Sequence, residues 1–146
     1  MKKIIIIFII TFSYLCSANN NLNYIETCFK TTCFTSRIAD NPISRTKGLM
    51  NEDYLPQNEG LLFIFPTNDI HEFWMKNMKF PIDIIFINDE NIITYIIKNA
   101  PVCKGTCDVY KPTRKSIMVL EVNAGMAEKH GIHVGQEVAY YIEDER

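Results

Sequence analysis

Hydrophobic positions along the chain gather in short segments separated by turn residues, the pattern typical of a β-rich protein. The clearest case is a hairpin, in which the apolar segments 82–87 (IDIIFI) and 92–98 (IITYIIK) flank four polar residues. Pro66 is expected to close a third apolar strand. The remaining predicted strands and extended segments are 24–39, 60–65, 71–76, 117–122 and 137–143.

Two short helices are predicted between these strands. Residues that favour helix ends mark them: Asp40 or Asn41, Pro42 and Gly48 for the first, and Asn123 and Gly131 for the second, which covers 124–129. Residues 99–116 are expected to form a long loop. Because consecutive strands are joined by short connections, their pairing should be mostly antiparallel. The predicted fold class is α+β, mainly β, with a small antiparallel sheet curled toward a barrel.

Residues 1–18 show the pattern of a secretory signal peptide. Two lysines precede an apolar segment, 4–15, that is too short to span a bilayer, and small residues follow it as far as Ala18. Removing 18 of the 146 residues leaves 128, the length of a single domain, 19–146. We therefore expect a periplasmic or secreted protein. An uncleaved anchor or a lipidated Cys16 is the alternative.

The charge balance argues against a nucleic-acid partner. The net charge is −2 for the whole chain, and without Lys2 and Lys3 the 13 remaining basic side chains face 17 acidic ones, giving −4. The basic residues are scattered and form no phosphate-tracking patch. No further segment is apolar enough to predict a membrane span. Glycine-rich phosphate loops, nucleophile elbows and HExxH motifs do not occur, so no cofactor and no metal site are predicted.

Four cysteines follow the signal peptide: Cys28, Cys33, Cys103 and Cys107. An even number in an exported protein indicates two disulfides, with three possible pairings. Two local bridges, 28–33 and 103–107, are the simplest arrangement, whereas a crossed pairing would close longer loops and stabilise more. A four-thiolate zinc site is the alternative, but the spacings and an oxidising compartment disfavour it.

The predicted strand 71–76 carries the only tryptophan of the chain. Alternation along a strand places Phe73 and Met75 on one face, suited to the core, and Glu72, Trp74 and Lys76 on the other. Trp74 could therefore cover a minor core, with the Lys76 stem along its ring. It could also form the platform of a ligand site, because an indole on a polar face is frequent in binding sites.

Two carboxylates, Asp83 and Glu121, occupy otherwise apolar strands. A buried carboxylate has to be paired, or its pKa rises until the group is protonated. The two could form an acid/base pair in an enzyme. They could also be the buried ends of structural salt bridges to cations such as Arg45, Lys76 or Lys79.

Six segments of the chain together resemble a known family. They are SRTKGLM (44–50), GLLFIF (60–65), FWMKNMKFPIDIIFI (73–87), NAP (99–101), VLEVNAG (119–125) and GIHVGQEV (131–138). In this order they resemble the DUF192 (UPF0127) family of uncharacterised bacterial and archaeal proteins. Met78, Leu62 and Gln136 depart from the family pattern, and the cysteine pairs look like local additions. The resemblance implies a compact, barrel-like β domain that is often exported, and it implies no activity.

These observations favour an exported accessory domain that binds a small polar or anionic ligand or an envelope protein partner. The expected ligand-binding residues are Arg45, Trp74, Lys76 and Asn77, with the indole as a stacking platform and the cations orienting the ligand. Two alternatives stay open: an envelope hydrolase with Asp83 and Glu121 as its acid and base, and a structural module of an envelope complex.

Overall fold

A computed structural model of the protein describes residues 24–142, so the predicted signal peptide 1–18 lies outside the described residues. The elements in chain order are β1 (Tyr24–Cys28), β2 (Cys33–Ala39), α1 (Pro42–Lys47), β3 (Glu59–Asp69), β4 (Phe73–Trp74), β5 (Ile82–Ile87), β6 (Ile93–Ala100), β7 (Val109–Tyr110), β8 (Ser116–Asn123), α2 (Met126–Lys129) and β9 (Ala139–Tyr141). Neither described helix has the length and apolarity needed to cross a membrane.

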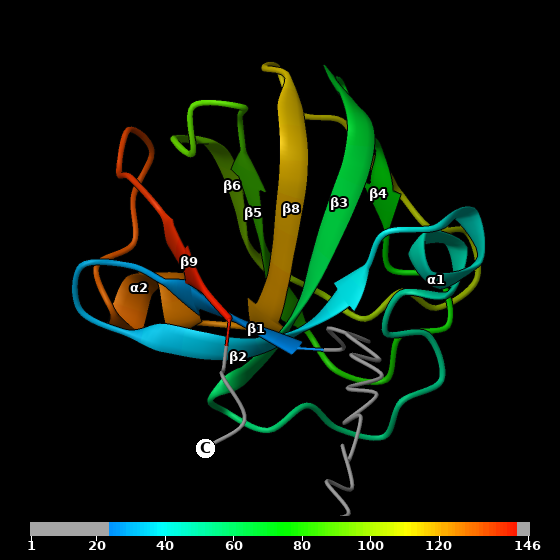
Figure 1. Ribbon diagram of the computed structural model, residues 1–146. Helices are drawn as coiled ribbons and strands as arrows, with labels where there is room; N and C mark the ends of the chain where they lie inside the picture. Colours follow the sequence, from blue (N-terminus) through cyan, green and yellow to red (C-terminus); the bar gives the residue numbers. More distant parts are fainter. Residues whose placement is uncertain (1–23, 143–146) are drawn as a thin grey trace, which may run out of the picture.

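Seven of these strands form one curled sheet in the order β6-β5-β8-β3-β2-β1-β9 (Figure 1). All neighbouring pairs are antiparallel except β2 and β3, which run parallel because α1 lies between them in the chain. The sheet curls until its two edges approach each other, where Ile92 and Glu137 form an isolated bridge. The expected mainly β, curled architecture is therefore confirmed, although the sheet does not close into a complete barrel.

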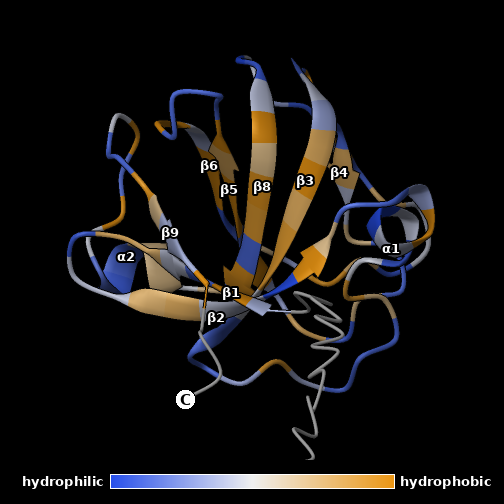
Figure 2. Cartoon of the chain, viewed as in Figure 1, coloured by the Kyte–Doolittle hydropathy of each residue, from blue (hydrophilic) through white to orange (hydrophobic). Residues whose placement is uncertain are grey.

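Hydrophobic residues recur along β8 and β3 (Figure 2), and alternation along the strands divides them between two apolar faces of the sheet. The inner face, enclosed by the curl, carries Leu62 and Leu120 and packs against α2. The outer face carries Leu61, Phe63 and Ile84 and is covered by the segments around α1 and β4. The sheet thus supports one core on each side.

Several predicted boundaries are wrong for identifiable reasons. β3 continues through Pro66 to Asp69. Its register with β8 shifts between Ile64 and Asp69, so Pro66, which has no N–H, interrupts no regular hydrogen-bond ladder there. β4 is only two residues long and pairs with β7, which lies inside the predicted loop 99–116. These two strands form a separate small sheet.

The caps of the two helices differ in how well the sequence predicts them. In α1, Asn41 caps two backbone amides, Pro42 follows it, and Gly48 ends the helix as predicted. In α2, Asn123 is not the N-cap. The helix begins after Gly125, which has a φ of 85°, while the Asn123 side chain bonds the carbonyl oxygens of Leu55 and Pro56. The amide therefore ties β8 to a distant loop instead of starting the helix.

The four cysteines form two local disulfides, Cys28–Cys33 and Cys103–Cys107. The first joins the facing ends of β1 and β2, where the two residues are register partners. The second closes a short ring in the loop that precedes β7. The pairing settles the alternatives left open by the sequence in favour of local bridges, and it leaves these thiols unavailable to zinc.

Candidate functional site

A cleft of about 410 Å³ opens on the outer face of the sheet beside β3. This volume is within the range of small-molecule sites. α1 and the residues after it supply one part of the lining, and β3 and β4 supply most of the rest. Figure 1 shows α1 and β4 on the same side of β3. The lining residues are Pro42, Arg45, Thr46, Lys47, Gly48, Leu49, Met50, Phe63, Phe65, Glu72, Phe73, Trp74, Met78 and Glu121.

Four aromatic side chains give the cleft its apolar surface. Phe63 and Phe65 project from the outer face of β3 with their rings stacked at 6.5 Å between centroids. Phe73 on β4 meets Phe63 edge to face at 5.0 Å. Trp74, the next residue, is 48% exposed and lines the cleft. Ring faces of this kind supply contact area for an apolar or aromatic ligand body.

Arg45 projects from α1 into the wall of the cleft. Its Nη1 donates hydrogen bonds to the carbonyl oxygens of Asp40 and Ile64, the latter at 2.9 Å, and its guanidinium lies 5.4 Å from the centre of the Phe65 ring. Among the residues that the structure describes, it forms no salt bridge with a carboxylate. Its position is therefore fixed by neutral groups, and its positive charge remains available to an anion.

The other three predicted binding residues are distributed unequally. Trp74 lines the cleft with Arg45. Lys76 does not line it; its ammonium lies 5.3 Å from the Trp74 ring centre. Asn77 is exposed, adopts a φ of 57° and accepts a hydrogen bond from Asn51 through its backbone carbonyl. The structure brings two of the four residues together in the cleft and places the other two beside it.

Glu121 on β8 lies at the floor of the cleft, and only 5% of its surface is exposed. Its Oε2 is buried and has no hydrogen-bond partner within residues 24–142. Burial, reinforced by the nearby negative charge of Glu52, raises the pKa of the Glu121 carboxyl to about 8. At neutral pH this group is therefore mostly an uncharged acid, able to donate one hydrogen bond and to accept others.

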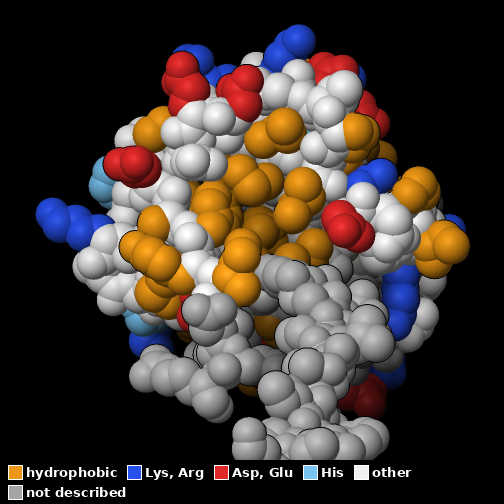
Figure 3. Space-filling model, viewed as in Figure 1, with side chains coloured by type: hydrophobic (Ala, Val, Ile, Leu, Met, Phe, Trp, Pro, Cys, Tyr) orange, Lys and Arg blue, Asp and Glu red, His pale blue; other side chains and the backbone are white. Residues whose placement is uncertain are grey.

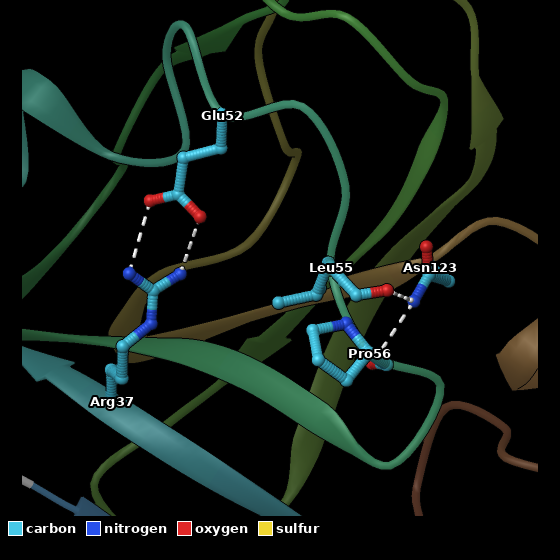
Figure 4. Close-up of polar contacts among 5 residues, drawn as sticks. All are labelled: Arg37, Glu52, Leu55, Pro56 and Asn123. Atoms are coloured by element: carbon cyan, nitrogen blue, oxygen red, sulfur yellow. Dashed lines mark hydrogen bonds and ion pairs between the residues drawn. The ribbon is translucent and has the colours of Figure 1, made fainter.

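The loop that follows α1 begins with cleft-lining residues 48–50 and is held in place by side chains of β2 and β8 (Figure 4). Arg37 on β2 binds Glu52 in a bidentate pair with distances of 3.0 and 2.8 Å. A few residues later, Asn123 holds the carbonyls of Leu55 and Pro56 at 2.8 and 3.2 Å. The loop that follows α1 is thus attached to both β2 and β8. Arg37 is thereby paired with Glu52, and no salt bridge to Glu121 forms within residues 24–142.

Asp83 is separated from Glu121 by the sheet itself. In the register of β5 and β8, Asp83 faces Val122 on the inner side, whereas Glu121 faces Ile84 on the outer side. The Asp83 carboxylate accepts hydrogen bonds from the backbone N–H groups of Asn99 at 2.7 Å and Ala127 at 2.8 Å. Neither carboxylate forms a salt bridge in the described part of the chain, so the expected structural ion pairs are wrong.

Sequence reasoning missed several residues of the cleft. Phe63 and Phe65 belong to the predicted strand 60–65, and the available signal is their spacing of two, which places both on one face. Lys47 lies two residues after Arg45, exposed and without a salt bridge between residues 24 and 142. Glu52 gives no local signal, because its influence depends on a loop that folds back toward β8.

A second surface feature lies on the inner face. Figure 3 shows hydrophobic side chains gathered at the centre of the molecule in this view, over the concave side of the sheet. The partly buried side chains that pack on the inner core are Ile25, Ile64, Ile96, Met118 and Tyr140. This apolar area is separated from the Trp74 cleft by the thickness of the sheet.

Fold and cleft together define a small β-rich domain with one curled sheet and one aromatic-walled cleft on its outer face. The chain belongs to the DUF192 family, described as Uncharacterized ACR, and the match covers residues 25–140. The resemblance inferred from the sequence motifs is thereby confirmed. No protein of curated function matches the chain.

Two solved structures share this fold. A protein of unknown function from Novosphingobium aromaticivorans DSM 12444 is 30% identical, with a TM-score of 0.70 over 80% of this chain and 83% of that chain. A protein from Sinorhizobium meliloti 1021, designated a candidate transcription regulator, is 26% identical, with a TM-score of 0.72 over 80% of this chain and 92% of that chain.

Proposed function

We propose that the protein is an exported accessory domain that binds a small anionic ligand with an apolar body in the Trp74 cleft. The observation that carries this proposal is the convergence of Trp74 and Arg45 on one concave surface. The aromatic rings supply contact area, and Arg45 and Lys47 supply positive charge that no carboxylate in residues 24–142 neutralises through a salt bridge. The N-terminal pattern and two disulfides support export.

Trp74 offers a direct test, because it is the only tryptophan of the chain and lines the cleft. The protein is titrated with a panel of small carboxylates, phosphate and acidic sugars while the tryptophan emission is followed. We expect at least one anion with an apolar body to change the emission saturably. An unchanged spectrum across the whole panel would refute the proposal.

Two lysine variants separate specific binding from a general charge effect. Lys47 lines the cleft, whereas Lys98 is a comparably exposed lysine of β6 outside it. Lys47→Gln should weaken binding of the responding anion by up to about fivefold, the value of one exposed charge contact, and Lys98→Gln should leave it unchanged. Equal effects of the two substitutions would show that the anion responds only to net charge.

One observation favours a second function, binding of a protein partner through the inner face. The apolar area around Ile96 and Met118 could support such a contact (Figure 3). The substitution Ile96→Ser would weaken a complex formed there and leave the Trp74 titration unchanged. The opposite pattern, a loss of ligand binding measured by calorimetry with Trp74→Ala and no effect of Ile96→Ser, favours the cleft as the functional surface.

A further inference from the structure

The cleft has two chemically different ends. Register places Glu121 opposite Leu61, while the Arg45 guanidinium bonds the carbonyl oxygen of Ile64. Leu61 and Ile64 are three positions apart, roughly 10 Å along β3, so the two polar groups lie at different ends of the cleft. Phe63 projects between them on the same face. The cleft is thus cationic at one end, aromatic in the middle and closed by a carboxyl group at the other end.

The end of the cleft at Glu121, called the inner end below, contains no partner for that carboxyl group. Oε2 of Glu121 is buried without a hydrogen bond from any described residue. The charged groups near Glu121 are paired with other residues or lie toward the rim of the cleft. Glu52 is held by Arg37, and Glu72 of the β4 wall is held by Lys111 at 2.9 Å. A buried acid whose hydrogen-bonding capacity is unmet costs free energy. A ligand atom at the exposed part of the Glu121 side chain, which lines the cleft, would recover some of it.

We propose that the cleft binds amphipathic organic anions that carry an uncharged oxygen at the end opposite the anionic group, and that Glu121 donates a hydrogen bond to this oxygen. This inference rests on the proposed function and names the ligand class of the same site. The anionic group lies toward Arg45 and Lys47, and the apolar body lies against Phe63 and Trp74. Glu121 is then the residue that determines specificity at the inner end.

Donation requires the neutral acid, so binding is linked to a proton. Burial raises the pKa of the Glu121 carboxyl to about 8, and the neutral fraction therefore falls as the pH rises through that value. Between pH 7 and pH 9 the neutral fraction decreases about tenfold, and most of the affinity that this hydrogen bond contributes is lost with it. Glutamine at this position keeps an N–H donor of similar shape and does not titrate.

Three isosteric probes test the inference: 4-ethylbenzoate, 4-methoxybenzoate, whose ether oxygen can only accept a hydrogen bond, and 4-(aminomethyl)benzoate. They share the carboxylate and the ring, and they differ only in an apolar, an uncharged polar or a cationic group at the opposite end. Affinities are measured by tryptophan fluorescence and by calorimetry at pH 7 and pH 9, for the wild-type protein and for Glu121→Gln.

We expect the methoxy probe to bind wild type about tenfold more tightly than the ethyl probe at pH 7, the value of one hydrogen bond to a buried group. This advantage should disappear at pH 9 in the wild type and persist at pH 9 in Glu121→Gln. The wild-type pH dependence does not rely on any variant folding correctly. The ethyl probe monitors changes at the Arg45 end.

The contrary outcomes are distinguishable. If none of the three probes binds at pH 7, both the proposed function and this inference fail for organic anions. If all three probes bind with equal affinity, and the affinities are the same for the wild type and Glu121→Gln, the proposed function stands and the inference fails. If the aminomethyl probe binds most tightly and gains affinity from pH 7 to pH 9, Glu121 acts as a carboxylate toward a cation, which also overturns the inference.

Discussion

Replacing Glu121 with glutamine should remove a pH-dependent loss of stability. Burial raises the pKa of this carboxyl from an ordinary value of 4.5 to about 8 in the folded protein. In the unfolded chain the group titrates near its ordinary value. Between these pH values the folded protein retains a proton that the unfolded chain has lost. The free energy of unfolding should therefore fall as the pH rises from about 4.5, and this fall should end above about 8.

The magnitude follows from the size of the shift. In the middle of this window each pH unit lowers the free energy of unfolding by about 1.4 kcal/mol, and the slope is smaller near the two pKa values. The interval from pH 5 to pH 8 therefore amounts to about 3.5 kcal/mol. Glutamine binds no proton in this range and escapes the effect. The stability of Glu121→Gln relative to wild type should grow by that amount from pH 5 to pH 8. This difference does not depend on how well the new amide is hydrogen-bonded.

Urea unfolding followed by far-ultraviolet circular dichroism, with both disulfides intact, measures the difference at pH 5, 6, 7 and 8. Glu90→Gln is the matched control, because Glu90 is an exposed carboxylate in the turn between β5 and β6. The control should follow the wild-type pH profile. Parallel profiles for wild type and Glu121→Gln would show that the Glu121 carboxyl reaches water or a cation in the folded protein, and the reasoning about the cleft floor would fail.

Three further predictions concern the scaffold and the wall of the cleft. Asp83→Asn leaves one of two backbone amides without its carboxylate acceptor and should lower the free energy of unfolding at pH 7 by about 1–3 kcal/mol, measured from urea curves. Removing the first disulfide by Cys28→Ser and Cys33→Ser together should cost about 2 kcal/mol in the same assay, the value for a short ring. Lys76→Ala should shift the Trp74 emission of the free protein, because it removes the ammonium over the ring, and should leave the affinity for benzoate probes unchanged.

Local patterns predicted most of the elements of this fold. The hairpin of β5 and β6 follows from two apolar segments around four polar residues, and α1 follows from Asn41, Pro42 and Gly48. The outward position of Trp74 agrees with strand alternation, because Phe73 and Met75 beside it are buried. In each case the residues that determine the structure lie within a few positions of one another.

Features that depend on distant segments escaped prediction. β4 is short because its partner β7 is short, and a two-residue strand inside a long loop has no recognisable period. Asn123 has the chemistry of a helix cap, but the carbonyls of Leu55 and Pro56 are nearby only after the loop beyond α1 has folded against β8. The position of Glu121 at the floor of the cleft also depends on distant segments. Sequence shows a carboxylate in an apolar strand, and it cannot show which face of the strand meets a cavity.

Asp83 and Glu121 illustrate how the same residue pattern can give scaffold or site. Both carboxylates lie on adjacent strands of the sheet, and both are buried. Asp83 receives two backbone N–H groups on the inner face, so its lone pairs are satisfied within the protein and it holds the start of α2 against β5. Glu121 has an oxygen without such a donor and lines an open cleft. A fold gains no stability from an unsatisfied acid at that position, so a role toward a bound molecule is the physical reason we assign to it.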